Sequence, residues 1–336
     1  MASEKLLYLA TSFASQFINA AQAKPTSPRR ILVVKLDEIG DMIYAMHCLE
    51  ALRSSFPDSE ITMWCKPMNN ALVQQTGAVN HLVHTRGDLK GKFDVQIDLR
   101  GSWESLRFAF LGGAKYYLER GSIRFRNKFS GGQIHETLTN QAILAPLLPN
   151  DFEWVHPSFH IDEETLTRIG QLLKSNHLSR YVLMHCGARD ASRRWPTERF
   201  SQLVDSIFER YGLKTVFIGS PNETELVEEV SSRTANAINL AGKTNLMELA
   251  ALCRRAEFFV GNESGPLHFA IVEKKPLVAL FGPGVKDVFY PLYASQRVIH
   301  HFLEKDHTKQ TVDNSTILRI SVADVLHEIE QIYSVD

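Results

Sequence analysis

The sequence is poor in cysteine and in net charge, and each shortage excludes a class of protein. Its 336 residues contain no CxxC pair and only four cysteines, Cys48, Cys65, Cys186 and Cys253. This pattern argues against a disulfide framework or a zinc site, and favours free thiols in a reducing cytoplasm. The formal net charge of −1 argues against a general nucleic-acid-binding protein. Apolar residues make up 44 % of the chain, which is enough for two domains with cores of their own.

The sequence also lacks a long uninterrupted apolar run. Residues 6–23 come nearest, but Ser, Thr, Gln and Asn interrupt them and make them too polar to span a bilayer. The start MASEK has no net positive charge, which argues against a signal peptide. We predict an amphipathic helix in an N-terminal extension, residues 1–28, that docks on the protein itself. Docking on a partner or on a membrane surface is the alternative.

Three common catalytic motifs are missing. No GxGxxG follows either first strand, which argues against a nicotinamide enzyme, and no GxSxG nucleophile motif occurs. The run LAGKT at residues 240–244 ends like a P-loop, but Ala237 stands where that motif needs glycine. His156 and His160 are interpreted as solvent-facing side chains rather than ligands. We therefore expect no metal site and no bound cofactor.

Apolar strands that alternate with amphipathic helices predict an α/β protein with two doubly wound, parallel-sheet domains. In the first domain a buried strand at residues 31–34 precedes a helix that begins near Asp41. In the second, the strand YVLMHCG precedes a helix with Thr197 as its cap and Gly212 as its stop. We place the domains at residues 29–165 and 166–336, and the last helix packs either on its own domain or back across the cleft. Ligands of such sheets bind beyond the carboxyl ends of the strands, which predicts a site in the cleft between the domains.

One stretch of the second domain, FFVGNESGPLHFAIVEKKPLVALFGPG, predicts an anion site. Its apolar start is a buried strand, Pro266 suits the first turn of a helix, and Pro276 ends that helix before the next strand. A helix start carries free N–H groups and the positive end of the helix dipole. The turn at Ser264 and Gly265 is therefore expected to hold a phosphate.

Three further loops follow strands of the same predicted sheet. HCGARDASRRWP offers Gly187 and a group of arginines, GSPNETE offers Glu223 to ribose hydroxyls, and AGKT offers Thr244 beside a flat base. Guanidinium groups suit phosphate oxygens because they donate in a fixed fork. Since strand-end loops of a parallel sheet meet at one edge, the four segments together predict a nucleotide diphosphate site.

Four segments resemble one protein family in order and spacing: KLDEIGDMIYAMHCLEAL, RRWPTERFSQLV, NLAGKTNLMELAALCRRAEFFVGNESGPLHFA and PLVALFGPG. They are similar to the heptosyltransferases of bacterial lipopolysaccharide synthesis, glycosyltransferase family nine. The resemblance covers roughly residues 31–291 and is stronger in the second half. It implies a GT-B fold with two Rossmann-like domains facing across a cleft, an ADP-activated heptose donor, inversion at the anomeric carbon and no required metal.

The resemblance also implies a catalytic base. Asp41 matches the family's general base, which deprotonates the acceptor hydroxyl. A plain helix N-cap is the alternative role for this residue. Asp98, at the end of the predicted strand FDVQIDL, is the reserve base, with a strand-end turn as its alternative role.

On the donor side, the resemblance assigns further residues besides Gly187 and Glu223. Arg193 stands where the family usually has a lysine on the donor phosphates, and Glu263 stands where it has an aspartate. These two departures leave the identity of the donor sugar open. The remaining assigned donor contacts are Thr244, Ser264, Gly265 and His268.

A run of basic residues between positions 100 and 128 is the predicted contact for an anionic acceptor. The assigned contacts are Asp98, Arg120, Arg124 and Arg126, and a solvated basic face is the alternative. The expected partners are a nucleotide sugar and a glycan or lipid-linked glycan, without nucleic acid. The expected location is cytoplasmic, with peripheral contact at the inner face of the membrane if the acceptor is lipid-linked.

Two other functions stay open at the level of sequence. One is a GT-B enzyme, a transferase or an epimerase, that uses a different nucleotide sugar. The other is a non-catalytic sugar-nucleotide-binding protein of the same fold, which the two substitutions at 193 and 263 favour and the retained Asp41 disfavours.

Overall fold

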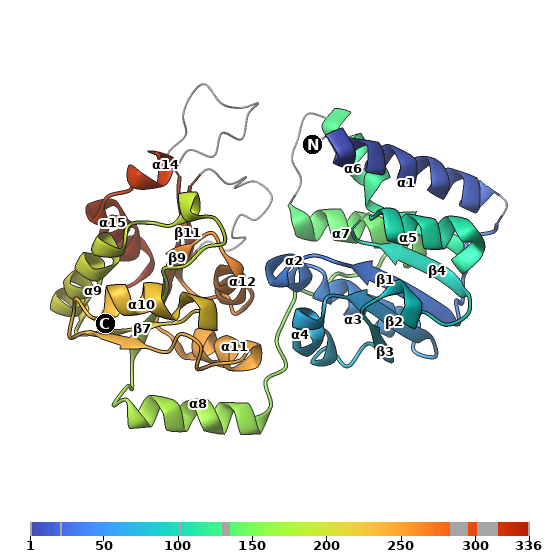
Figure 1. The fold of residues 1–336 in the computed structure, drawn as a ribbon. Coiled ribbons are helices and arrows are strands. Elements are labelled where there is room, and N and C mark those ends of the chain that lie inside the picture. Colours follow the sequence, from blue (N-terminus) through green and yellow to red (C-terminus); the bar gives the residue numbers. More distant parts are fainter. Residues whose placement is uncertain are drawn as a thin grey trace. The chain divides into compact units, whose positions relative to one another are not determined.

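The computed structural model describes residues 2–20, 22–100, 102–129, 135–282, 295–300 and 315–334. The chain forms two compact units, Met1–Ser158 and Phe159–Asp336 (Figure 1). The division falls in the irregular stretch before helix α8 (Glu163–Ser175), whereas the predicted boundary at 165/166 falls inside this helix. Asp162 caps α8 by accepting a hydrogen bond from the backbone N–H of Thr165 at 2.7 Å. The segment that links the two units therefore ends at Asp162, where helix α8 begins.

The first unit is built on a five-stranded parallel sheet in the order β3-β2-β1-β4-β5. The strands are β1 (Arg30–Lys35), β2 (Glu60–Cys65), β3 (His81–Val83), β4 (Phe93–Asp98) and β5 (Ala114–Glu119). The helices that connect and cover them are α2 (Ile39–Ile43), α3 (Met46–Ser55), α4 (Asn70–Gln74), α5 (Trp103–Phe108), α6 (Arg120–Phe129) and α7 (Glu136–Leu144). The central strand β1 is buried from its second residue onward and apolar from Ile31 to Val34, because helices cover both faces of the sheet.

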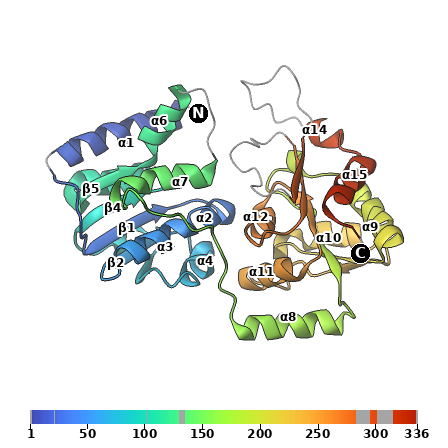
Figure 2. The ribbon, with the colours of Figure 1, turned by 180° about the vertical axis from the view of Figure 1, so that it is seen from behind.

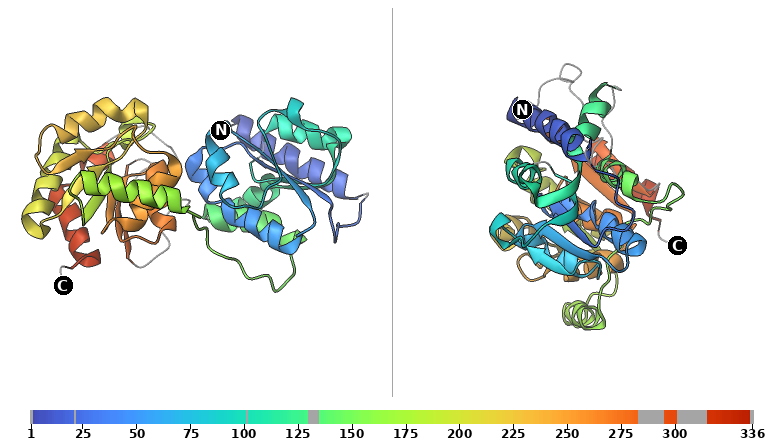
Figure 3. Two further views of the ribbon diagram at one scale, coloured as in Figure 1. Left: turned by 90° about the horizontal axis from the view of Figure 1, so that it is seen from below. Right: turned by 90° about the vertical axis from the view of Figure 1, so that its right-hand side faces the viewer.

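Helix α1 (Ala2–Ala20) packs on the first unit, as predicted for the N-terminal extension. It closes the outer edge of the sheet, where β5 has backbone groups without a neighbouring strand. The Asn19 side chain accepts from the N–H of Tyr117 and donates to the C=O of the same residue, both at 2.9 Å, and the Ser15 hydroxyl donates to that C=O as well. Figures 2 and 3 show α1 lying beside α6. The extension is thus an integral part of the first unit.

The second unit contains a six-stranded parallel sheet in the order β11-β10-β9-β6-β7-β8. The strands are β6 (Tyr181–His185), β7 (Lys214–Phe217), β8 (Ala237–Asn239), β9 (Phe259–Asn262), β10 (Leu277–Phe281) and β11 (Gln296–His300). The helices besides α8 are α9 (Thr197–Tyr211), α10 (Thr224–Ser231), α11 (Leu246–Arg255), α12 (Gly265–Val272), α14 (Ser315–Leu318) and α15 (Val322–Ile332). Since β6 and β9 are adjacent and central, the loops that follow them lie in the middle of one sheet edge.

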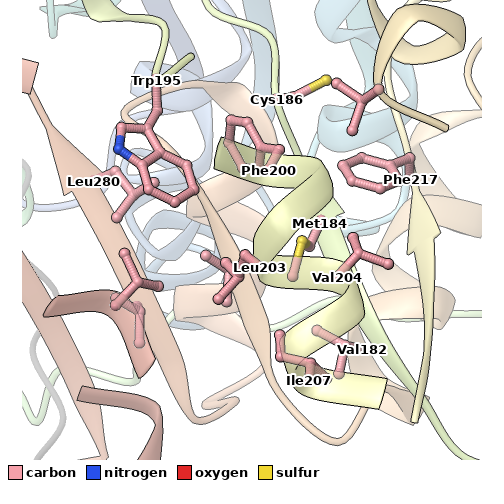
Figure 4. Packing of buried hydrophobic residues seen from close by; sticks show 14 of the residues in the cluster. Val182, Met184, Cys186, Trp195, Phe200, Leu203, Val204, Ile207, Phe217 and Leu280 are labelled. Atoms are coloured by element: carbon pink, nitrogen blue, oxygen red, sulfur yellow. The ribbon is translucent and has the colours of Figure 1, made fainter. Parts of the chain in front are cut away.

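The core of the second unit forms where α9 lies on the sheet (Figure 4). The helix buries four residues of its predicted apolar stripe, Phe200, Leu203, Val204 and Ile207, whereas the fifth, Phe208, is 37 % exposed. It ends at Gly212, whose φ of +66° is a left-handed conformation that glycine adopts without steric cost. Val325 and Ile329 of α15 belong to the same cluster, so the last helix packs on its own domain.

A carboxyl group is buried at the end of β4. Asp98 accepts hydrogen bonds from the Ser105 hydroxyl at 2.5 Å and the Tyr117 hydroxyl at 3.1 Å. Burial disfavours the charged form and raises the pKa of Asp98 to about 8, although the two hydroxyl groups act in the opposite direction. At neutral pH this side chain is therefore protonated in the folded protein.

This protonation makes the stability of the first unit depend on pH. An unfolded aspartate releases its proton near pH ~4, while folded Asp98 keeps its proton until about pH 8. The stability that Asp98 contributes is therefore present below the lower value and is lost as pH rises through this window. Asp98→Asn keeps the shape and removes the titration. We expect its melting temperature to fall less than that of the wild type as pH rises, as measured by calorimetry. Equal destabilisation of the variant at every pH would contradict this account.

Candidate functional site

Four strand-end loops of the second unit meet at one edge of its sheet. The loop after β7 contacts the loop after β8, where the N–H of Gly242 donates to the C=O of Gly219 at 2.9 Å. The loop after β6 contacts the loop after β9, where the guanidinium of Arg193 lies 3.3 Å from the Glu263 carboxylate. The sequence predicts this convergence from the parallel order of the strands, and the structure confirms it.

His185 connects three of these loops. It is the last residue of β6, and its Nδ1 lies 2.8 Å from the hydroxyl of Ser264, at the start of α12. Its Nε2 lies 3.3 Å from the carboxylate of Glu223, in the loop after β7. Sequence reasoning missed this residue. The available signal was its position at the carboxyl end of a central strand, two residues before Gly187.

Gly187 lets the Glu223 carboxylate approach the backbone. A Cβ at position 187 would overlap the Oε1 of Glu223, so any other residue would displace this side chain. The Oε2 of Glu223 accepts from the N–H of Ser220 at 2.7 Å and from its hydroxyl at 2.8 Å. Burial opposes ionisation, but His185 and the Ser220 donors outweigh it and lower the pKa of Glu223 to about 2. The side chain is a fixed carboxylate, an acceptor suited to sugar or ribose hydroxyls.

The pair of Arg193 and Glu263 brings together the two departures from the family pattern. Glu263 is almost fully buried, and one of its oxygens, Oε2, makes no hydrogen bond within the described residues. Burial raises the pKa of Glu263, and the facing Arg193 lowers it. A buried acceptor oxygen without a donor is costly unless a ligand supplies one. The pair therefore offers a cation for phosphate and an acceptor for a hydroxyl.

Asn262 holds the loops after β6 and β9 in place. Its side-chain amide donates to the C=O of Cys186 at 2.8 Å, and its side-chain oxygen accepts from the N–H of Trp195 at 3.1 Å. The residue is fully buried. Sequence reasoning treated it only as part of a turn, because its partners are distant in the sequence. It is a positioning residue for the segment that carries Arg193.

The start of α12 is open, as predicted. Ser264 is the N-cap residue in an extended conformation, and its hydroxyl bonds to the Asn262 C=O at 3.0 Å and to His185 instead of capping the helix. A Cβ built on Gly265 meets nothing within 4 Å. His268 is buried in the first turns of α12. The Ser264 side chain thus leaves the first N–H groups of the helix uncapped, and an anion is a suitable partner for such groups.

Thr244 lies in the loop that leads from β8 to α11. It is half-buried, and the loop reaches the loop after β7 through Gly242, which has a φ of +71° and packs against Pro221. The structure therefore places Thr244 in the same group of loops as Glu223. Its assigned contact with a base stays a prediction.

In the first unit, Asp41 lies inside the short helix α2 and not at its N-cap, which is Glu38. The capping role that is the alternative for Asp41 is therefore wrong. The side chain is partly buried and makes no hydrogen bond to the described part of the chain. Burial raises the pKa of Asp41, while the neighbouring Lys35 lowers it. A carboxylate with a raised pKa and no fixed donor suits a general base.

A buried group of charges surrounds this position. Glu136, at the start of α7, lies 2.8 Å from the amine of Lys35 and accepts two hydrogen bonds from Arg120, at 2.6 and 2.5 Å. Lys35 also contacts Asp37 at 2.8 Å. Burial opposes the charge of Glu136, but Lys35 and Arg120 outweigh it and hold its pKa well below the usual range. We call this group the buried ion cluster: Lys35, Asp37, Arg120 and Glu136.

The predicted acceptor contacts fall in different environments. Arg120 is buried in the ion cluster and Asp98 is fully buried at the end of β4, so neither presents a surface to an acceptor in this structure. Both assignments are corrected to structural roles. The sequence shows a basic residue within a basic run and an acidic residue at a strand end, but it does not show whether these side chains are buried. Arg124 is partly exposed and lies 3.5 Å from Glu136, and Arg126 is exposed on α6.

Comparisons with known proteins agree with this arrangement. A family model described as glycosyltransferase family 9 (heptosyltransferase) matches residues 84–317. The lipooligosaccharide heptosyltransferase 2 of Haemophilus ducreyi is 24 % identical over 313 residues, which cover 82 % of this chain and 89 % of that protein. The lipopolysaccharide heptosyltransferase 2 of Salmonella typhimurium is 23 % identical over 354 residues, which cover 91 % of this chain and 99 % of that protein.

A solved structure has the same fold. The Escherichia coli ADP-heptose lipopolysaccharide heptosyltransferase II superposes with a TM-score of 0.71 at 22 % identity, covering 90 % of this chain and 98 % of that one. The two parallel-sheet units thus form the predicted GT-B fold.

Proposed function

Because the chain belongs to glycosyltransferase family 9, the heptosyltransferases, and is therefore a glycosyltransferase, we propose that it transfers a heptose from ADP-heptose to a lipopolysaccharide core or a related glycan. The observation that carries the proposal is the group of strand-end loops in the second unit. His185, Glu223 and Ser264 meet there, next to the pair of Arg193 and Glu263. This group offers a carboxylate for hydroxyls and a cation with helix N–H groups for a diphosphate.

In the proposed reaction the second unit binds the donor. Arg193 and the first N–H groups of α12 stabilise the negative charge that develops on the departing diphosphate. Glu223 accepts from the ribose hydroxyls and Glu263 from the sugar. The cation at the leaving group is a guanidinium in this proposal, so the transfer requires no metal ion.

The first unit supplies the base. A carboxylate oxygen of Asp41 takes the proton of the acceptor hydroxyl, and the acceptor oxygen forms a bond to the anomeric carbon. The bond from that carbon to the diphosphate oxygen breaks, and ADP leaves with its electron pair. Attack from the face opposite the leaving group inverts the anomeric configuration.

Fewer residues support the proposed contacts with the acceptor. Arg124 and Arg126 are the two exposed or partly exposed cations that remain of the predicted contacts. Their charges suit the anionic groups of a lipopolysaccharide core. No helix in the described part of the chain is both long and apolar enough to cross a membrane. For a lipid-linked acceptor we propose a cytoplasmic enzyme that contacts the inner face of the membrane.

Nucleotide binding tests the donor assignment. Purified protein is titrated with ADP, UDP, GDP and CMP, and the heat released is followed by calorimetry. A clear preference for ADP supports the proposal and leads to ADP-heptose as donor in a transfer assay. A preference for another nucleotide would be compatible with the proposed transfer reaction but would reject ADP-heptose as the donor. Binding to none of them by folded protein rejects the proposed donor site.

Removing the Arg193 guanidinium is expected to weaken ADP binding. Charge-assisted hydrogen bonds contribute enough that Arg193→Ala raises the Kd about 10- to 100-fold. Calorimetric titration measures the effect. Arg233→Ala is the matched control, because Arg233 pairs with Glu198 and Glu229 outside the four loops. An unchanged Kd in Arg193→Ala would remove this residue from the donor site.

A further inference from the structure

Helix α1 exposes an apolar stripe although its opposite side is already packed. Between Leu6 and Ala20 the helix carries no charged side chain. Leu7, Thr11 and Ala14 face the protein and are buried. A second set at helical spacing remains in water: Leu6, Leu9, Phe13 and Phe17, with Phe13 70 % and Phe17 73 % exposed. Docking of α1 on the first unit therefore does not account for its second apolar stripe.

The exposed stripe borders an apolar groove of about 580 Å³ between α1 and α5. The rings of Phe17 on α1 and Phe110, in the segment directly after α5, lie 6.1 Å apart, so α1 and this part of the chain present a continuous surface. Trp103, Phe110 and Leu111 are 49 %, 59 % and 62 % exposed. We call this surface the α1–α5 face; it comprises Phe13, Phe17, Trp103, Phe110 and Leu111. A patch of this kind on a water-soluble surface marks a binding site for an apolar partner.

Charged residues near this face indicate which partner it binds. Arg107 lines the groove itself, and Glu104 is the only acid on α5. The neighbouring helix α6, which packs against α1, has four cations and no acid in its sequence RGSIRFRNKF. Two of these cations, Arg120 and Arg124, pair with Glu136, whereas Arg126 is exposed, so Arg107 and Arg126 place positive charge on the two helices that pack against α1. This positive charge attracts an anionic surface and repels a second copy of the same face across a two-fold axis.

We propose that the α1–α5 face docks on an anionic phospholipid bilayer. Phe13, Phe17 and Trp103 enter the boundary between headgroups and acyl chains, and Arg107 and the exposed Arg126 of α6 contact lipid phosphates. The inference extends the proposed function by naming the surface that brings the enzyme to a lipid-linked acceptor. Bilayer binding is nevertheless measurable without nucleotide, acceptor or transfer.

Vesicle binding tests the proposal. The purified full-length protein is floated with vesicles of phosphatidylcholine and phosphatidylglycerol, and with vesicles of phosphatidylcholine alone. We expect binding to the anionic vesicles, weakened by salt but not abolished, because only the electrostatic part is screened. Phe13→Ser with Phe17→Ser is expected to lower the partition coefficient at least about tenfold, since two large apolar side chains are lost. The matched control is Met68→Ser with Leu138→Ser, two exposed apolar residues of the first unit that do not line the groove.

Trp103 gives a second measurement that needs no stability control. Its emission is expected to shift to the blue on addition of anionic vesicles, and Trp103→Phe is expected to abolish the shift. Absence of binding, or equal binding by the Phe13/Phe17 variant, overturns the proposal. If the wild type binds no vesicles and sediments as a dimer, and the Phe13/Phe17 variant is monomeric, the partner of the α1–α5 face is a second copy of the chain and not a bilayer. The Phe13/Phe17 variant is expected to keep the ADP affinity of the wild type, so a failed ADP titration affects only the proposed function.

Discussion

Asp41→Asn is expected to lower the rate of sugar transfer by about 10²–10⁴-fold, which is the range for loss of a positioned general base. The amide has nearly the same shape but does not take the acceptor proton. Asp41 lies in the first unit, while the proposed donor contacts are in the second, so the affinity for ADP is expected to stay unchanged. Single-turnover transfer and calorimetric titration measure the two quantities separately.

Glu38→Gln is the matched control for this variant. Glu38 precedes the same helix, and its carboxylate pairs with the amine of Lys66 at 2.7 Å where both side chains are substantially exposed. An exposed pair of this kind contributes little, so rate and stability are expected to stay close to those of the wild type. Equal loss of rate in both variants would point to disruption of α2 and not to a missing base.

The rate of the wild type should also report the environment of Asp41. Burial raises its pKa, and a base acts only in its ionised form. The rate is therefore expected to fall as pH decreases through this raised pKa, at a higher pH than for an ordinary aspartate. In Asp41→Asn the acidic limb should be absent from the residual rate. A residual rate with the same acidic limb would assign the proton transfer to another group.

The sequence was sufficient to predict that the four loops of the second unit meet, because each of them follows a strand. In a parallel sheet the carboxyl ends share one edge, so Gly187, Glu223, Thr244 and Ser264 are brought together by strand order alone. Pro266 and Pro276 located α12, and the residues at its start, Ser264 to Pro266, are partly exposed. The existence and the end of helix α9 were predicted correctly because its apolar period and its terminal Gly212 are local signals, but the predicted cap was wrong, since Pro196 is the N-cap and Thr197 is the first helical residue.

The contacts inside this site were not predictable in the same way. His185 and Ser264 are 79 residues apart, and Asn262 bonds to the backbone of residues in another loop. No local pattern records a hydrogen bond between distant segments. The basic run was interpreted as an acceptor surface for a related reason. Charge is visible in a sequence, whereas the partner that neutralises Arg120 lies 16 positions away in another helix.

The same partner, Glu136, accounts for the largest expected change in stability. It is fully buried between Lys35 and Arg120, and its side chain bonds to both. Glu136→Gln leaves the buried Arg120 without its carboxylate partner and Lys35 with Asp37 alone, for which the expected cost is about 3–5 kcal/mol in the free energy of unfolding. Urea denaturation measures this value. Arg124→Gln is the control, because Arg124 is partly exposed and lies 3.5 Å from Glu136, so its loss is expected to cost less than about 1 kcal/mol.

Acidification distinguishes a charge effect from a packing effect in Glu136→Gln. The pKa of Glu136 is lowered by Lys35 and Arg120 despite its burial, so the stabilisation is complete above the pKa of an unfolded glutamate. It is lost as pH falls from about 4 toward the lower folded pKa. The difference between wild type and variant should therefore shrink in that window, whereas a packing defect would leave it constant. Because Glu136 also raises the pKa of Asp41, the acidic limb of the transfer rate should move to lower pH in this variant. If Glu136→Gln is stable and the acidic limb of its transfer rate stays at the wild-type pH, the buried ion cluster does not influence the pKa of the catalytic base.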